Sequence, residues 1–211
     1  AGIVSAHASA LGATASFISV VGNDINNAKA KKFLNEYNVN HHLIIDENRP
    51  TTLKTRYRAA NKTLLRVNEL YSGSIQKSIQ ENILKKIKEN IHEVDVLIFS
   101  DFNYGCLPQN LLNEIIKLTK NKKIITAADS QCSSQIGDIS RFKNMSLITP
   151  TEFEARISLR NNDDGLIVLG NKLKKITNVE NVILKLGSQG MIVFPNETER
   201  FKEDNFLEVG I

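Results

Sequence analysis

The 211-residue sequence has no tryptophan, two cysteines and only 6% aromatic residues. It has no uncharged apolar run of about 18 residues, which excludes a membrane-spanning helix. No basic segment precedes an apolar stretch, so no signal peptide is visible. Cys106 and Cys132 lack the spacing of a metal or redox motif. A reducing cytoplasm is therefore the simplest compartment, and a disulfide in the periplasm is the alternative.

The formal net charge of +4 is small for a chain of this length. Nucleic-acid-binding proteins more often concentrate lysine and arginine along one stripe with aromatic side chains between them. We therefore expect neither a nucleic acid nor a membrane as partner, and phosphorylated small molecules fit the positive surplus. Hydrophobic residues at 41% and charged residues at 24% are typical of a globular protein. The length suits one domain.

Short apolar strand patterns alternate with helical patterns along most of the sequence. Strands separated by helices of this length predict βαβ units, a mainly parallel sheet and helices on both of its faces. Segment 191–194 is expected to be the hairpin partner of 182–186. The expected strands are 15–22, 95–100, 124–128, 146–149 and 182–186, and the expected helices are 25–37, 109–120, 155–159 and 165–176.

One stretch interrupts this alternation. Segments 42–46, 51–59 and 63–69 favour strand and have no helix between them. They predict a small antiparallel sheet inserted in the α/β body, with a turn at 59–62. Such flaps commonly act as lids, and an edge extension without a role is the alternative.

The predicted flap carries a cluster of cationic side chains. Lys54, Arg56 and Arg58 share one face because side chains alternate along a strand. Arg66 joins them if the loop has three residues, and it faces the other way if the loop has two or four. Arginine binds phosphate oxygens in a bidentate manner. The cluster therefore predicts a clamp for an anionic substrate, or else a solvated strand face.

Gly187-Ser188-Gln189-Gly190 directly follows a predicted strand. Backbone amides in such a turn can hold a phosphate, and Lys185 adds positive charge. A plain hairpin turn is the alternative.

Carboxylates follow the carboxyl ends of several predicted strands, namely Asp101, Asp129, Glu152 and Glu154. Ligands of open α/β sheets bind beyond these ends, where carboxylates can hold Mg²⁺. Each carboxylate could instead cap a helix, and Thr151 with Glu154 forms a capping box in the sequence.

Eight segments together resemble the ribokinase-like (PfkB-type) sugar kinases in order and spacing, and more specifically the bacterial D-glycero-β-D-manno-heptose 7-phosphate kinases. The resemblance covers nearly the whole sequence. The segments are 1–4 (AGIV), 11–13 (LGA), 20–24 (VVGND), 50–56 (PTTLKTR), 64–68 (LLRVN), 100–105 (SDFNYG), 149–154 (TPTEFE) and 185–191 (KLGSQGM).

The resemblance implies a three-layer α/β/α kinase domain over residues 1–211, with a β lid at about 42–69. It implies ATP and Mg²⁺ as cofactors, a sugar phosphate as substrate, and a homodimer formed through the lid. Because a helix comes first and an extended segment comes last, we expect a domain truncated at both ends.

The residues and the resemblance together predict the site. For the substrate they predict Gly2, Lys54, Arg56, Arg66 and Asp101; for the nucleotide Asp129, Lys185, Gly187, Ser188 and Gly190; and for Mg²⁺ Glu154.

The sequence departs from the family pattern in several places. Ile3 stands where many members have asparagine, and Tyr104 stands where the heptose kinases have lysine. Thr151 stands where the family has asparagine, and Gln131 stands where the heptose kinases have lysine. The Gly-Ala-Gly-Asp motif, which brings the catalytic aspartate in the family, is missing. Loss of a general base typically slows catalysis about 10²–10⁴-fold, so we expect this polypeptide alone to be nearly inactive. The alternatives are a non-catalytic sugar- or nucleotide-binding domain of the same fold and a kinase for a different sugar.

Overall fold

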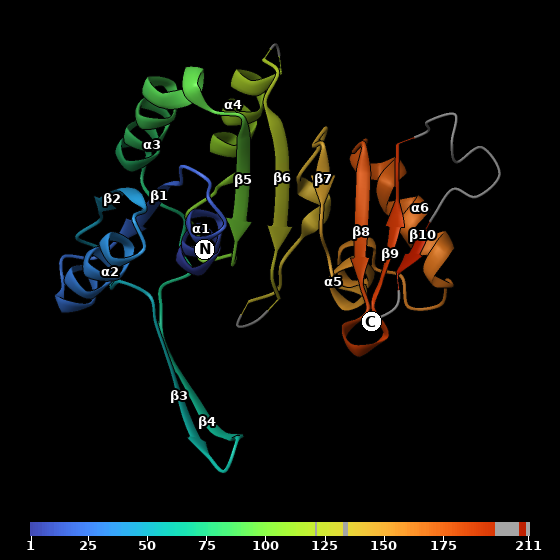
Figure 1. Cartoon of the computed structure of the whole chain (residues 1–211), viewed down its shortest axis with the longest axis horizontal. Coiled ribbons are helices and arrows are strands. Elements are labelled where there is room, and N and C mark those ends of the chain that lie inside the picture. The colour runs from blue at the N-terminus through green and yellow to red at the C-terminus, as the bar shows by residue number, and fades with distance from the viewer. Residues whose placement is uncertain (121, 133–134, 197–206, 210–211) are drawn as a thin grey trace. The chain divides into compact units, whose positions relative to one another are not determined.

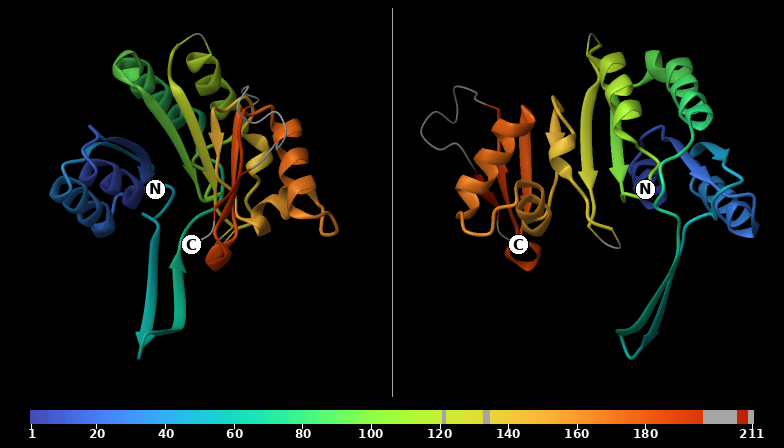
Figure 2. Two further views of the ribbon diagram at one scale, coloured as in Figure 1. Left: turned by 45° about the vertical axis from the view of Figure 1, so that its right-hand side comes forward. Right: turned by 180° about the vertical axis from the view of Figure 1, so that it is seen from behind.

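The structure is a computed structural model that describes residues 1–120, 122–132, 135–196 and 207–209 (Figures 1 and 2). The chain divides into two compact units. The first unit contains residues 1–92 and 104–115, and the second contains 93–103 and the described residues from 116 onward. A single domain over 1–211 stays a prediction.

The first unit opens with α1 (Gly2–Ala10), β1 (Ser16–Val21), α2 (Ile25–Glu36) and β2 (Asn40–Ile45). Asp24 caps α2 by accepting a hydrogen bond from the backbone amide of Asn27. Val20, Val21 and Leu34 are buried between these elements. The expected strand and helix are both confirmed.

The expected place of segment 42–46 in the antiparallel lid is wrong. Residues 42–45 of this segment lie within β2, which pairs in parallel with β1 along its whole length. A helix between two strands returns the chain to run in the same direction, and α2 makes this connection. The strand pattern was correct, but a local pattern does not tell which strand will be its partner.

The lid is a hairpin of two strands, β3 (Leu53–Ala59) and β4 (Lys62–Glu69), which pair only with each other in the described chain. Figure 1 and both views of Figure 2 show it as a separate two-stranded ribbon. Its turn is Ala60-Asn61, with φ of 44° and 63°. Left-handed backbone at both central residues is typical of a type I′ turn. α3 (Lys77–Asn90) and a short 3₁₀ helix, η1 (Ile91–Glu93), follow.

The second unit is built on a six-stranded sheet of order β10-β9-β8-β7-β6-β5. Neighbours from β5 to β8 are parallel, whereas β9 pairs antiparallel with both β8 and β10. The expected mainly parallel sheet and the hairpin of β8 with β9 are confirmed. The strands are β5 (Val96–Asp101), β6 (Ile125–Ser130), β7 (Leu147–Ile148), β8 (Asn181–Lys185), β9 (Met191–Phe194) and β10 (Leu207–Val209).

The core of the second unit lies between this sheet and its helices. Ile148, Val182 and Phe194 are fully buried. Gly170 of α6 must be glycine, because a Cβ there would lie 2.1 Å from Cζ of Phe194. The remaining elements of this unit are η2 (Ile139–Arg141), α5 (Glu152–Leu159), α6 (Leu166–Thr177) and η3 (Gly187–Gln189). α4 (Gln109–Thr119) belongs to the first unit as far as Ile115 and to the second from Ile116. Over the residues that the structure describes, no helix is long and apolar enough to cross a bilayer.

Candidate functional site

The hairpin places two arginines directly opposite each other. If the strands paired regularly from the two-residue turn onward, Arg66 would lie on the opposite face from Arg56. The register instead shifts by one residue between Tyr57 and Arg58, because Leu64 is an extra residue in β4. This β-bulge makes Arg56 and Arg66 cross-strand partners, so their side chains share one face. The loop length was therefore not enough to predict the face.

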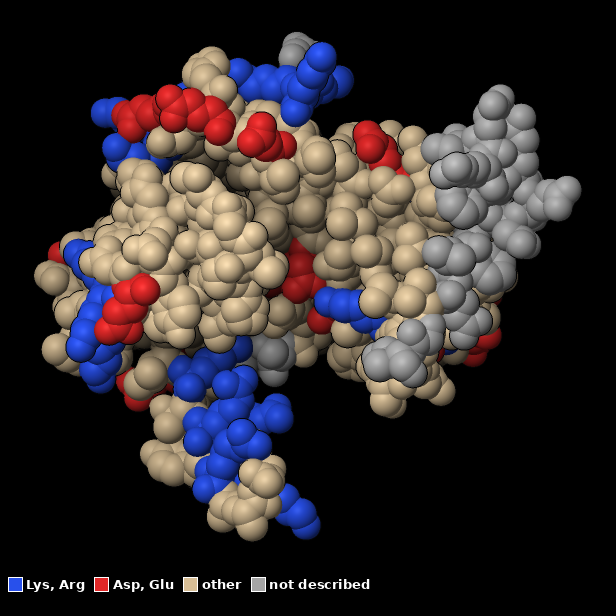
Figure 3. Space-filling view, in the orientation of Figure 1, with Lys and Arg blue, Asp and Glu red and all other residues tan. Residues whose placement is uncertain are grey.

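We call this face, formed by Lys54, Arg56, Arg58 and Arg66, the cationic face. Figure 3 shows lysine and arginine side chains gathered over the hairpin. Both members of the Arg56–Arg66 pair are exposed, and like charges directly opposite on a sheet are destabilising. An anion with several oxygens would relieve this repulsion. Lys54, nearer the base of the hairpin, places Nζ 5.1 Å from the ring centre of Tyr104, a cation–π distance.

The predicted nucleotide residues of the second unit gather at the carboxyl ends of β6, β7 and β8. Lys185 Nζ donates to Oδ1 of Asp129 at 2.9 Å. The hydroxyl of Thr149 and the side-chain amide of Gln131 also donate to the Asp129 carboxylate, at 3.3 and 3.1 Å. Asp129 thus orients Lys185, and the Lys185 side chain is still partly exposed, at 39%.

The Gly-x-x-Gly segment is a tight turn between β8 and β9. Gly187 and Gly190 have φ of 63° and 94°, the left-handed region that favours glycine. Gly187 and Ser188 are exposed, whereas Gly190 is buried. A Cβ on Gly187 would meet no atom within 4 Å. The turn therefore has open space beside it, directly after Lys185.

Glu154, the predicted Mg²⁺ ligand, is buried and bound to backbone amides. Its Oε2 accepts from the amide of Thr151 at 2.7 Å and its Oε1 accepts from the amide of Cys132 at 3.2 Å. The first bond completes the capping box of α5. The second ties the segment after β6 to the start of α5. In the described chain no group of three or more acidic, histidine or cysteine side chains could hold a metal ion.

Asp101, a predicted substrate residue, lies buried at the end of β5 in the second unit. Its Oδ1 accepts from the amide of Asn103 at 2.9 Å, and Nη1 of Arg141 lies 3.8 Å from its Oδ2. Burial raises the pKa of the Asp101 carboxyl, although the Asn103 amide and the charge of Arg141 oppose the rise.

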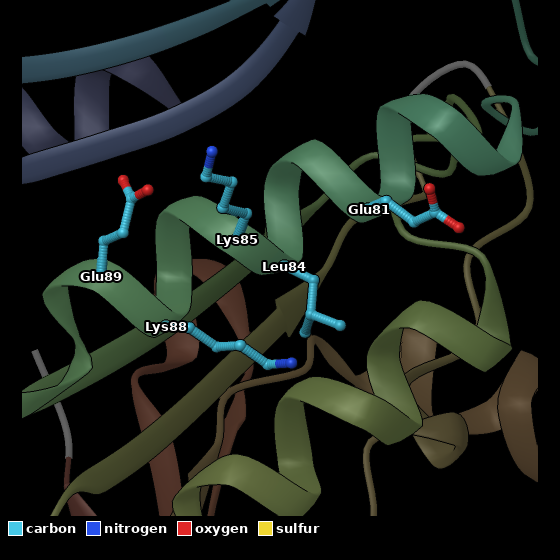
Figure 4. A pocket seen from close by; sticks show the side chains of 5 residues that line it. All are labelled: Glu81, Leu84, Lys85, Lys88 and Glu89. Atoms are coloured by element: carbon cyan, nitrogen blue, oxygen red, sulfur yellow. The ribbon is translucent and has the colours of Figure 1, made fainter.

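Gly2, the remaining predicted residue, starts α1 in the first unit. A Cβ there would make only an ordinary contact, 3.9 Å from Leu34, so nothing in the structure demands glycine. A hollow of about 520 Å³ lies along α3, and Figure 4 shows its five labelled residues on that helix. It contains none of the predicted site residues, which are spread over the hairpin, α1 and the strand ends.

Two buried or half-buried arginines were not among the predicted site residues. Arg49 is buried just before the hairpin and is bound to Asp46. Arg141 faces Asp101 from η2. No local pattern marks either residue. Asp46 precedes Arg49 by three residues, but the other partners of Arg49 and the partner of Arg141 come from distant segments. The proline that follows Arg49 marks only the entry to the hairpin.

Comparison with known proteins now adds to this geometry. The family model described as "pfkB family carbohydrate kinase" matches residues 3–206 of this chain. The chain belongs to the pfkB family of carbohydrate kinases. The resemblance found in the sequence is thereby confirmed at the level of the family.

Curated relatives of this pfkB-family chain include proteins named "Bifunctional protein HldE". That of a Nitratiruptor species is 30% identical over 194 residues, which cover 90% of this chain and 40% of that protein. That of Helicobacter acinonychis (strain Sheeba) is 33% identical over 160 residues, which cover 74% of this chain and 33% of that protein. The chain thus spans about two-fifths or less of the length of these relatives.

Solved structures confirm the fold of the family. Phosphofructokinase-2 from Escherichia coli in complex with potassium superposes with a TM-score of 0.74 at 16% identity, covering 99% of this chain and 65% of that chain. Ribokinase from Giardia lamblia superposes with a TM-score of 0.73 at 15% identity, and the match covers 98% of this chain and 64% of that chain. The chain therefore has the ribokinase-like α/β fold, with a mainly parallel sheet and a small antiparallel sheet, as the sequence predicts.

Proposed function

We propose that the protein containing this chain transfers the γ-phosphate of ATP to a hydroxyl of a sugar phosphate. The substrate we propose is heptose 7-phosphate, in the synthesis of ADP-heptose for lipopolysaccharide. The HldE relatives and the resemblance of segments 50–56 and 64–68 support the choice of sugar. The observation that carries the proposal is the cross-strand pair of Arg56 and Arg66.

This arginine pair favours a phosphorylated sugar over an uncharged one. Two adjacent guanidinium groups repel each other, and covering them with an uncharged substrate would desolvate them without an opposite charge. A phosphate offers oxygens to both forks at once. One solved relative, phosphofructokinase-2 from Escherichia coli, has been crystallised with fructose-6-phosphate. Gly2 and Asp101 complete the proposed sugar site by resemblance to the family.

For the nucleotide we propose the carboxyl ends of β6 and β8. Lys185, held by Asp129, supplies a positive charge for phosphate oxygens. Gly187, Ser188 and Gly190 line the nucleotide at the turn that follows. This arrangement suits phosphoryl transfer, in which the protein mainly positions the reactants and stabilises charge. A cytoplasmic location belongs to the same proposal.

Mg²⁺ fits this site as an ion carried mainly by the nucleotide. Mg²⁺ usually keeps several waters and binds through one or two carboxylates together with substrate phosphates. Because both Glu154 oxygens already accept backbone amides, we assign Glu154 to the outer shell of the ion. When bound, the ion neutralises negative charge on the phosphates.

The face of the hairpin opposite the cationic face supports a homodimer. Tyr57, Leu65 and Val67 lie on it and are 55%, 55% and 41% exposed. An isolated two-stranded hairpin is marginally stable in water, and an exposed apolar strand surface favours association. We propose that a second copy of the chain covers this face.

A coupled assay of ADP release tests the proposed function. We expect the full-length protein to turn over heptose 7-phosphate at a far lower KM than unphosphorylated heptose. The 211-residue chain should release ADP at least about 100-fold more slowly. Equal KM for the two sugars would remove the phosphate clamp. Binding of sugar phosphate without turnover by the full-length protein would support the non-catalytic alternative, and full activity of the short chain would place the general base within it.

A further inference from the structure

Arg49 lies between β2 and β3, at the entry to the hairpin, and its charge is buried. Its side chain is 4% exposed, and Nε donates to Oδ2 of Asp46 at 2.9 Å. Asp46 also accepts from the backbone amide of Asn48 at 3.0 Å. A buried guanidinium needs a partner of opposite charge and well-made hydrogen bonds. Asp46 provides the charge and sets the orientation of the fork.

The rest of the fork reaches the exit of the hairpin and a third segment. Nη2 donates to the carbonyl of Gly73 at 2.9 Å, and Nη1 donates to the carbonyl of Tyr104 at 3.0 Å. The guanidinium also lies 5.3 Å from the ring centre of Tyr71, a cation–π distance. Tyr71 and Gly73 follow β4. One side chain therefore joins the segments that enter and leave the hairpin.

The hairpin depends on these two segments for its orientation, since in the described chain its strands pair with no other strand. The entry is anchored by Thr51, whose amide donates to Asp24 at 2.7 Å and whose hydroxyl accepts from the amide of Gly22 at 2.9 Å. The exit packs on Gly105, where a Cβ would lie 2.0 Å from the carbonyl oxygen of Gly73. Arg49 connects the anchored entry to this exit.

We propose that Arg49 is a positioning residue that sets the orientation of the cationic face over the substrate. This inference rests on the proposed function. We assign Arg49 no contact with substrate, because its guanidinium is bound to Asp46, Gly73 and Tyr104. It acts through Arg56 and Arg66. Lysine cannot replace it, because one ammonium group lacks the planar fork that reaches several partners at fixed angles.

The experiment compares Arg49→Lys with the wild type in the full-length protein. Lys62→Arg, an exposed substitution on the other face of the hairpin, is the matched control. Two readouts are measured: steady-state KM for heptose 7-phosphate and for ATP, and amide hydrogen exchange by mass spectrometry. For Arg49→Lys we expect KM for the sugar phosphate to rise about tenfold, and exchange across residues 53–69 to accelerate about tenfold. KM for ATP and exchange in β1 and β2 should stay within about twofold of the wild type. Lys62→Arg should change neither readout.

Tyr71→Leu provides a second variant that leaves the buried charge in place. Because Tyr71 is 48% exposed, this variant is expected to fold, and it should shift the same two readouts in the same direction by a smaller factor. Faster amide exchange throughout the first unit, or equal rises of KM for both substrates, would show that Arg49 only stabilises the fold in general. Either result would overturn the proposal. Unchanged exchange in the hairpin would overturn it as well. If the wild type phosphorylates no sugar phosphate, the proposed function fails, while the exchange pattern still decides whether Arg49 orients the hairpin.

Discussion

Arg56 and Arg66 show how one inserted residue changes the chemistry of a surface. With a regular ladder, the two-residue turn would have paired Arg56 with Leu65, leaving charge and apolar side chains mixed on both faces. The bulge at Leu64 gathers the four cationic residues on one face. Tyr57, Leu65 and Val67 lie on the other face, which has Lys62 and Glu69 at its two ends. Leu64 thus shapes both the proposed phosphate site and the proposed surface for association.

Replacing either arginine tests the clamp directly. For Arg56→Gln and Arg66→Gln in the full-length protein we expect KM for the sugar phosphate to rise about 10- to 100-fold, the effect of losing a charge-assisted hydrogen bond. KM for ATP should change by less than about twofold. Lys62→Gln is the matched control, because it removes a charge from the other face of the same hairpin. Equal effects on both substrates in steady-state kinetics would contradict the assignment.

Glu154 is a residue for which the capping interpretation and the ligand interpretation were both open in the sequence. In the structure Glu154 forms the capping box of α5. It also accepts a hydrogen bond from the amide of Cys132, which the sequence did not indicate. That second bond lets one carboxylate hold the segment after β6 in place beside Asp129. The role of Glu154 toward Mg²⁺ stays a prediction.

Between elements, the junction of β1, α2 and the hairpin depends on a single carboxylate. Asp24 caps α2 and also accepts the amide of Thr51 at the entry to the hairpin. Gly22 must approach closely here, since a Cβ would lie 2.4 Å from the carbonyl oxygen of Arg49. The hydrogen bond from the Thr51 amide holds the pKa of the Asp24 carboxyl below its ordinary value of 3.8, with burial opposing.

This pKa predicts a pH-dependent loss of stability in Asp24→Asn. Near pH 3.8 the unfolded state binds more protons than the folded state, so stability rises with pH. The contribution of Asp24 is full above 3.8 and is lost as the pH falls through the lower folded value. Asparagine keeps the cap but loses the charge. We expect the free energy of unfolding of Asp24→Asn to be about 1.5 kcal/mol lower than that of the wild type at pH 7. This difference, the stability gap, should disappear in strong acid.

Urea unfolding at a series of pH values measures this gap. Glu36→Gln, on the same helix and exposed, serves as control and should change stability by less than about 0.5 kcal/mol at every pH. A gap for Asp24→Asn that is the same at pH 2 and pH 7 would show that the charge does not contribute.

At the scale of the whole molecule, the exposed apolar residues of the hairpin predict that the protein forms a dimer. Val67→Lys places a charge on the apolar face, where a partner copy would have to desolvate it. We expect sedimentation velocity to show a dimer for the wild type and a monomer for this variant at the same concentration. Thr63→Lys, whose residue pairs with Arg58 on the cationic face, should remain dimeric. A dimeric Val67→Lys protein would place the interface elsewhere.

Much of the architecture followed from local patterns. Alternating apolar residues, the cap at Asp24 and the Ala60-Asn61 turn located most strands and helices, because secondary structure responds to neighbours in sequence. The pairing of β2 with β1, the register that brings Arg56 opposite Arg66, and the bonds from Arg49 to Gly73 and Tyr104 could not be found in this way. The strand pairing and the Arg49 bonds join segments that are not neighbours in sequence, so they are chosen by packing and by the need to satisfy buried charge in the folded chain. The register depends on one bulged residue, Leu64, which no local pattern marks.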